Sequence, residues 1–156
     1  YIPYGYQPKG EQWEYPSVKK KVVNTLGFLN PITNHLVTYN LPDKTNMNSE
    51  LFIKYMNDFV SKRSQKTIVI LDNASFHKSR ITKSKFEQWE SKGVYILLLP
   101  SRSPHLNLIE ILWRTIKYKW LTIRDYRSQS TLLRKLKKIF SQFGGKYNID
   151  FSVNNI

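Results

Sequence analysis

The stretch TIVILDN, residues 67–73, is the part of this chain that decides its fold. Its first five residues are β-branched or aliphatic, and such a continuous apolar run is typical of a strand that is covered on both faces. The predicted strand ends on Asp72. A carboxylate at the end of a buried strand costs free energy unless its charge has a partner, and a divalent cation is one such partner. Asp72 is therefore a candidate metal ligand.

A second apolar run, at residues 94–99, predicts another buried strand. Between the two runs, residues 80–91 contain Phe86 and Trp89 and predict one helix, which Gly93 ends. Two strands joined by a helix are expected to be parallel. Ligands of such sheets bind at the carboxyl ends of the parallel strands, which is where Asp72 is placed.

The residues before this unit predict a hairpin and a helix. Strands over residues 19–29 and 35–39 flank a turn at Asn30-Pro31. Asn46 or Asn48 is suited to cap a helix that runs to about Ser61, in which apolar residues recur at helical spacing.

The residues after this unit begin with a proline-punctuated turn, residues 100–104, and continue into an apolar helix. Asn107 and Glu110 have the spacing of a capping box at the start of that helix. A last helix is predicted over residues 131–143, with an apolar stripe on one face. Its other face carries Arg134, Lys135, Lys137 and Lys138. Residues 146–156 have the composition of an irregular tail.

The alternation of strands and helices predicts an α/β fold in which helices flank a mixed sheet. With 156 residues, of which 40% are hydrophobic, the chain is long enough to bury the core of one domain, expected over residues 1–145. The absence of cysteine excludes disulfides and cysteine-ligated zinc. The apolar runs are far too short to cross a membrane, and no signal peptide is visible.

The charge is strongly unbalanced. The chain has 25 Lys and Arg against 11 Asp and Glu, which gives a net charge of +14. Such an excess points to a polyanionic partner, most often nucleic acid. The alternative is a basic soluble domain that has no such partner.

Two motifs resemble the DDE transposases of bacterial insertion sequences that are related to the mariner group. The first is DNASFH at residues 72–77, and the second is LPSRSPHLNLIE at residues 99–110, followed by Trp113. The family pattern is Asp-Asn, a later His, and a Leu-Pro…Ser-Pro…Leu-Asn-x-Ile-Glu run before Trp. The resemblance extends over roughly residues 4–125 when a weaker Tyr-x-x-x-Gly echo at Tyr6 and Gly10 is included.

This resemblance implies a ribonuclease-H-like fold and a site that holds two Mg²⁺ or Mn²⁺ ions. Asp72 would bind both ions and Glu110 one of them. The ions would activate water or a DNA 3′-hydroxyl and stabilise the leaving oxygen during DNA cleavage and strand transfer at transposon ends. Taken alone, Asp72 could instead be a structural carboxylate that caps a helix, and Glu110 a capping-box acid paired with Arg114.

The chain also departs from the family pattern. Arg102 stands where an aromatic residue is common, and Leu108 stands where proline is common. The family uses three acids, and the first lies on a first strand that would precede Tyr1. We therefore expect a catalytic domain that lacks its amino-terminal part and its first strand, and that binds DNA with little or no cleavage. Whether the chain itself is an enzyme stays open at this point.

Other residues near the two acids are candidates for supporting roles. Asn73, Asn107 and His77 are expected to lie behind the metal ligands and orient them. Asn107 is equally suited to a plain helix cap, and His77 to a phosphate contact or a solvated loop. Cations beside the acids are expected to hold DNA phosphates, although such a run is more often a solvated face. They are Lys78, Arg80, Lys83, Arg102 and Lys117.

The preferred function is that of a transposase catalytic domain, with DNA and a second copy of the chain as partners and the bacterial cytoplasm, with its nucleoid, as location. Two alternatives remain open. One is a DNA-binding remnant whose metal site is incomplete, and the other is a cellular nuclease of the same fold. A glycosidase built on two carboxylates is disfavoured by the basic charge.

Overall fold

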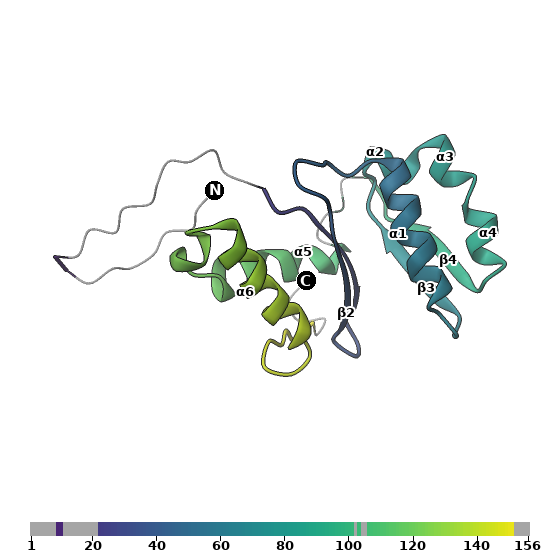
Figure 1. Cartoon of the computed structure of the whole chain (residues 1–156). Coiled ribbons are helices and arrows are strands. Elements are labelled where there is room, and N and C mark those ends of the chain that lie inside the picture. The colour runs from purple at the N-terminus through teal and green to yellow at the C-terminus, as the bar shows by residue number, and fades with distance from the viewer. Residues whose placement is uncertain (1–8, 11–21, 102, 104–105, 152–156) are drawn as a thin grey trace. The chain divides into compact units, whose positions relative to one another are not determined.

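The computed structural model describes residues 9–10, 22–101, 103 and 106–151 (Figure 1). The chain forms two compact units, each with its own buried residues. Unit 1 combines the chain up to Lys44 with the chain from Leu108 onward, and unit 2 runs from Thr45 to Asn107. Residues 19–21 of the predicted first strand, Tyr6 of the weaker echo and Arg102 lie outside the described residues.

Unit 2 begins with helix α1 (Ser49–Ser61). Of the two predicted caps, the structure uses Asn48, whose side-chain oxygen accepts a hydrogen bond from the Leu51 backbone N–H at 2.9 Å. The buried residues of α1 share one face, as the helical spacing predicted. They are Phe52, Met56, Phe59 and Val60.

The parallel strand pair of unit 2 is also confirmed. Strand β3 (Thr67–Leu71) pairs in parallel with β4 (Val94–Leu98), and Thr67 lies opposite Val94. Helices connect the two strands, and Figure 1 shows α1 and these connecting helices grouped with the strand pair. The carboxyl ends of both strands therefore lie at the same edge of the sheet.

The connection between the strands differs from the single helix predicted over residues 80–91. It consists of α2 (Ser75–Lys78), α3 (Arg80–Lys83) and α4 (Phe86–Glu90). Hydroxyl side chains explain the interruption, because they offer the backbone alternative hydrogen bonds. The Ser84 hydroxyl donates to the Ile81 carbonyl at 2.9 Å, and the Lys85 N–H bonds to the Thr82 carbonyl, only three residues back.

Within unit 2, helices cover one face of the strand pair, and the expected cover of the other face stays a prediction. Val69, Leu71 and Val94 are buried, whereas the opposite face of the strand pair is exposed. The reason is the alternation of side chains along a strand, because the helices of this unit cover only one of its faces. The exposed side chains are Ile68, Ile70, Tyr95 and Leu97, and the register pairs Ile68 with Tyr95 and Ile70 with Leu97.

Unit 1 opens with the predicted hairpin. Strands β1 (Thr25–Asn30) and β2 (His35–Asn40) are antiparallel. The turn forms where Asn30-Pro31 predicted it, because the Asn30 side-chain oxygen accepts hydrogen bonds from the backbone N–H groups of Ile32 at 3.0 Å and Thr33 at 3.1 Å. The first strand begins later than predicted, at Thr25.

The rest of unit 1 is helical. Helix α5 (Leu108–Thr115) leads into a π-helical turn, η2 (Ile116–Trp120), and a 3₁₀ turn, η3 (Ile123–Tyr126). Helix α6 (Gln129–Ser141) follows, capped by the Ser128 hydroxyl, which accepts from the Thr131 N–H at 3.1 Å. It begins two residues before the predicted start.

The core of unit 1 joins these helices to the hairpin. Its buried residues come from α5, η2, the residue after η2, and α6, in the order Leu112, Ile116, Leu121, Leu136 and Ile139. Strand β1 passes very close to α5, because a Cβ atom built on Gly27 would lie 2.7 Å from Cζ2 of Trp113. Glycine is therefore required at this point of β1.

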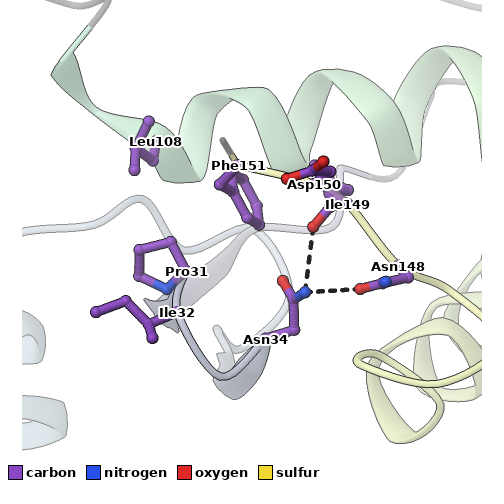
Figure 2. Close-up of a pocket in the computed structure, with 8 residues that line it drawn as sticks. All are labelled: Pro31, Ile32, Asn34, Leu108, Asn148, Ile149, Asp150 and Phe151. Atoms are coloured by element: carbon purple, nitrogen blue, oxygen red, sulfur yellow. Dashed lines mark hydrogen bonds between the residues drawn. The ribbon is translucent and has the colours of Figure 1, made fainter. Parts of the chain in front are cut away.

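Residues 146–151 of the predicted tail form no helix and pack against the hairpin turn (Figure 2), and residues 152–156 lie outside the described residues. The Asn34 side chain donates to the Asn148 side chain at 2.7 Å and to the Ile149 carbonyl at 3.1 Å. These residues, with Leu108 of α5, border an open hollow of about 490 Å³. No helix among the described residues is long and apolar enough to span a bilayer.

Candidate functional site

Asp72 is the first residue after β3 and lies at the carboxyl ends of the two parallel strands. Its Oδ1 atom accepts a hydrogen bond from the Ala74 N–H at 3.0 Å and lies 2.9 Å from Nδ1 of His77. Its Oδ2 atom has no hydrogen-bond partner in the described part of the chain, and the side chain is 42% exposed. Hydrogen bonds thus hold one oxygen of the carboxylate, and the other oxygen remains available to a ligand.

His77 is a donor to Asp72. Its Nδ1 also lies 3.1 Å from the Asp72 backbone carbonyl, and because a carbonyl only accepts, Nδ1 carries the proton. The ring is buried between Phe52 and Phe76, with centroid distances of 4.5 Å and 4.3 Å. The structure therefore places His77 against Asp72, and the solvated-loop alternative is wrong.

The charge state of His77 follows from this environment. Burial lowers its pKa below the usual 6.5, and the hydrogen bonds and charge of Asp72 oppose that shift only in part. The ring is consequently neutral near pH 7, with the proton on Nδ1. Its Nε2 atom is buried and has no hydrogen-bond partner among the residues described.

A cluster of hydroxyl groups fixes the short helix that carries His77. The Phe76 carbonyl accepts hydrogen bonds from Thr82 at 2.7 Å, from Ser79 at 3.3 Å and from Ser49 of α1 at 3.4 Å. The Thr82 side chain is fully buried. Sequence reasoning missed these residues. The spacing of Ser79 and Thr82, which suits a helix cap, was the available signal, because the Ser79 hydroxyl accepts from the Thr82 N–H at 3.2 Å.

Asn73 acts on the backbone next to the site. Its side-chain amide donates to the Leu99 carbonyl, and the Leu99 N–H donates to the Leu71 carbonyl at 2.8 Å. Asn73 therefore connects the chain just after β3 to Leu99, the residue just after β4. Asn73 supports the position of Asp72 through the backbone, and it does not contact the carboxylate.

Glu110 lies in the first turn of α5 and is exposed. The described residues of unit 1 include no donor to its carboxylate, and it forms no ion pair with Arg114. Asn107 directly precedes α5, and the capping box between Asn107 and Glu110 stays a prediction. The Glu110 carboxylate is consequently available to a ligand.

The chemistry of these two carboxylates suits a hard divalent cation, because Mg²⁺ and Mn²⁺ prefer oxygen ligands. Asp72 offers Oδ2, and Glu110 offers both oxygens. The two residues belong to different units, and the carboxylate of each one by itself suits such a cation. The described residues contain no group of three or more His, Cys, Asp or Glu side chains placed to hold one ion.

The predicted phosphate-binding cations are distributed over both units. Lys78, Arg80 and Lys83 are exposed on α2 and α3, just after Asp72 in the chain. Lys117 is half-buried on η2, and its Nζ lies 5.2 Å from the centroid of the Tyr118 ring. The first three are free to meet a phosphate backbone beside the site.

Comparisons with known proteins identify the family and the fold of this chain. A family model described as DDE superfamily endonuclease matches residues 1–133. A solved structure, the Mos1 transposase paired-end complex with left transposon end, is similar with a TM-score of 0.59 at 14% identity over 90% of this chain. The chain spans 44% of the length of that chain. This likeness confirms the ribonuclease-H-like mixed α/β fold. No curated protein matches the chain.

Proposed function

Because this chain belongs to the DDE superfamily endonucleases, we propose that it takes part in metal-dependent cleavage and strand transfer of DNA at transposon ends. The observation that carries the proposal is the Asp72 carboxylate, which two donors hold through Oδ1 while the side chain stays 42% exposed. The similar Mos1 structure is described as a complex with a transposon end, which supports DNA as the partner.

Asp72 and Glu110 would hold the divalent ions. Mg²⁺ or Mn²⁺, when bound, would activate the attacking oxygen and stabilise the leaving oxygen of the phosphodiester. Asp72 would provide Oδ2, held in place by its bonds to Ala74 and His77. Glu110 would provide a second carboxylate from the first turn of α5.

Three cations would position the DNA next to Asp72. Lys78, Arg80 and Lys83 are exposed on the two short helices that follow it, where they would neutralise phosphates of the bound strand. Such contacts fix the register of the strand without reading its sequence. A homodimer, a bacterial insertion-sequence origin and a nucleoid location remain predictions.

Cation binding is the first test, because Mg²⁺ usually takes only one or two carboxylates from a protein. We would titrate the chain with Mn²⁺ and follow free Mn²⁺ by electron paramagnetic resonance. Asp72→Asn and Glu110→Gln are each expected to weaken Mn²⁺ binding by roughly tenfold or more. Glu90→Gln, which removes an exposed carboxylate on α4, is the matched control and should leave the affinity unchanged.

DNA chemistry is the second test. Supercoiled plasmid is incubated with the chain and Mn²⁺, and any nicking should be lost in Asp72→Asn and kept in Glu90→Gln. If Asp72→Asn and Glu90→Gln bind Mn²⁺ equally well, Asp72 is not a metal ligand and the proposed mechanism is wrong. If the chain binds Mn²⁺ through Asp72 but binds no DNA, the proposed substrate is wrong.

A further inference from the structure

Helix α6 carries the most one-sided charge pattern among the described helices. Its thirteen residues include Arg134, Lys135, Lys137 and Lys138 and no acidic residue. Arg134, Lys137 and Lys138 are exposed, while Leu136 and Ile139 of the same helix are buried in the core of unit 1. The three exposed cations therefore share the solvent face of one rigid helix.

Lys135 has a different environment from the other three. It is half-buried, its Nζ lies 3.3 Å from the hydroxyl of Tyr147, and it lies 5.7 Å from the centroid of that ring. It holds the segment after α6 and belongs to the packing of unit 1. The candidate binding face is limited to Arg134, Lys137 and Lys138.

Helix α1 gives an internal comparison, because it has the same length as α6. Its charges are mixed in sign: Glu50 lies in its first turn, and Asp58 forms an ion pair at 2.6 Å with Lys62, the residue after the helix. This is the usual arrangement of a solvated helix face, in which opposite charges four residues apart support the helix.

The charges of α6 destabilise the helix instead, because they are all positive. Arg134 lies three residues before Lys137 and four before Lys138, and like charges at these spacings are unfavourable. The described part of the chain offers none of the three an ion pair. A solvated face gains nothing from this arrangement, whereas a bound polyanion would relieve the repulsion.

The geometry of the face fits a phosphate backbone. With a rise of about 1.5 Å per residue, Arg134 and Lys138 are separated by roughly 6 Å along the helix. Exposed Ser130 and Ser141 extend the same face at its two ends, where the Ser130 hydroxyl bonds to the Ser128 hydroxyl at 2.9 Å and the Ser141 hydroxyl donates to the Lys138 carbonyl at 3.1 Å. Cations and hydroxyls on one helix face are the groups that contact phosphate oxygens in protein–DNA complexes.

We propose that Arg134, Lys137 and Lys138 form a phosphate-binding face for double-stranded DNA. The face lies beyond residue 133, where the match to the family model ends, so it extends the DNA-binding surface past the part that the family defines. It deepens the proposed function, on which it rests for the identity of the polyanion. It binds the backbone and carries no sequence preference.

The test compares two variants that remove the same amount of charge. Arg134→Gln/Lys137→Gln/Lys138→Gln neutralises the face with residues that keep helix propensity. Lys54→Gln/Lys66→Gln/Lys92→Gln removes three exposed cations from unit 2, away from the candidate site residues, and is the control. Binding of a fluorescent DNA duplex is measured by anisotropy over a series of salt concentrations, with EDTA present so that no metal contributes.

We expect the α6 variant to bind DNA at least tenfold more weakly than the control at about 0.1 M salt. Its plot of log affinity against log salt should be shallower by about 0.9 for each phosphate that the variant no longer neutralises. Its melting temperature should equal or exceed that of the wild-type chain, because removing the three charges relieves repulsion. If the variant instead melts at a lower temperature and binds more weakly, the three residues stabilise the fold and are not shown to contact DNA.

The outcomes separate this inference from the function on which it rests. If the wild-type chain binds duplex in a salt-dependent way and the two triple variants bind equally, the α6 face is not a DNA contact and the proposed function stands. If the wild-type chain binds no duplex at any salt concentration, DNA is not the partner, and both proposals fail. If the α6 variant binds single-stranded DNA more weakly than the control variant but binds the duplex equally well, the assignment to double-stranded DNA is also wrong.

Discussion

At the scale of single residues, the Asp72–His77 contact is the feature that links the sequence motif to chemistry. A carboxylate free to rotate would present either oxygen to a cation, whereas this one is restrained through Oδ1 by Ala74 and His77. Partners that orient a metal ligand in this way commonly affect metal affinity by about 10–100-fold. The buried imidazole thus orients the Asp72 carboxylate.

Replacing His77 tests this positioning role. His77→Phe keeps an aromatic ring between Phe52 and Phe76 but removes the donor to Asp72, so we expect Mn²⁺ affinity to fall by roughly tenfold with little loss of folded protein. His77→Asn retains an N–H donor and should recover part of the affinity. Both are measured by Mn²⁺ titration beside circular dichroism. Equal affinities in His77→Phe and wild type would show that the contact does not matter for the metal.

The lowered pKa of His77 makes the stability of the chain depend on pH. The unfolded chain, with its ordinary His pKa of 6.5, binds a proton more readily than the folded one, so stability is lost as pH falls below about 6.5. We expect the melting temperature in EDTA to fall further between about pH 7.5 and about pH 5.5 for wild type than for His77→Phe. Parallel changes in the two proteins would contradict the buried, neutral histidine.

At the scale of elements, β1 and α5 approach each other closely at Gly27. Gly27→Ala would bring a methyl group to 2.7 Å from the Trp113 ring, so the ring or the strand must shift. We expect a loss of about 1–3 kcal/mol in the free energy of unfolding, measured by urea denaturation. Gly145→Ala is the control, because its nearest neighbour, the Gln142 carbonyl, lies at 3.7 Å. Equal stability of both variants would disprove the steric argument.

The elements also show what sequence patterns predict and what they do not. Helix α1 and the strands β3 and β4 were predictable because long apolar patterns and the Asn48 cap act locally. The break between α3 and α4 was not, because it depends on hydroxyl bonds such as that of Ser84 to the Ile81 carbonyl. Asp72 and Glu110 could be named as candidate site residues from the motif and from their positions. The contact of His77 with Asp72 could not be predicted, because it depends on the three hydroxyl groups that donate to the Phe76 carbonyl.

At the scale of the whole molecule, the net charge of +14 opposes folding through self-repulsion. Added salt screens this repulsion, so the melting temperature should rise between about 0.02 M and about 0.2 M NaCl. The Arg134→Gln/Lys137→Gln/Lys138→Gln variant, which carries three positive charges fewer, should show a smaller rise. Differential scanning fluorimetry measures both. A melting temperature that does not change with salt would mean that the charges are too dispersed to repel each other.

The π-helical turn η2 makes unit 1 sensitive to the deletion of a residue in this turn. The Leu121 N–H bonds to the Ile116 carbonyl five residues back, at 2.9 Å, so this turn holds one residue more than an α-helical turn. Trp120, at its end, packs on Phe143 and Tyr147 with ring centroids 6.3 Å and 5.0 Å away. Deleting one residue here would restore a regular helix and rotate Trp120 by about 100°, away from both rings. The turn thus behaves as an absorbed insertion, and unit 1 tolerates substitutions there better than a change in residue number.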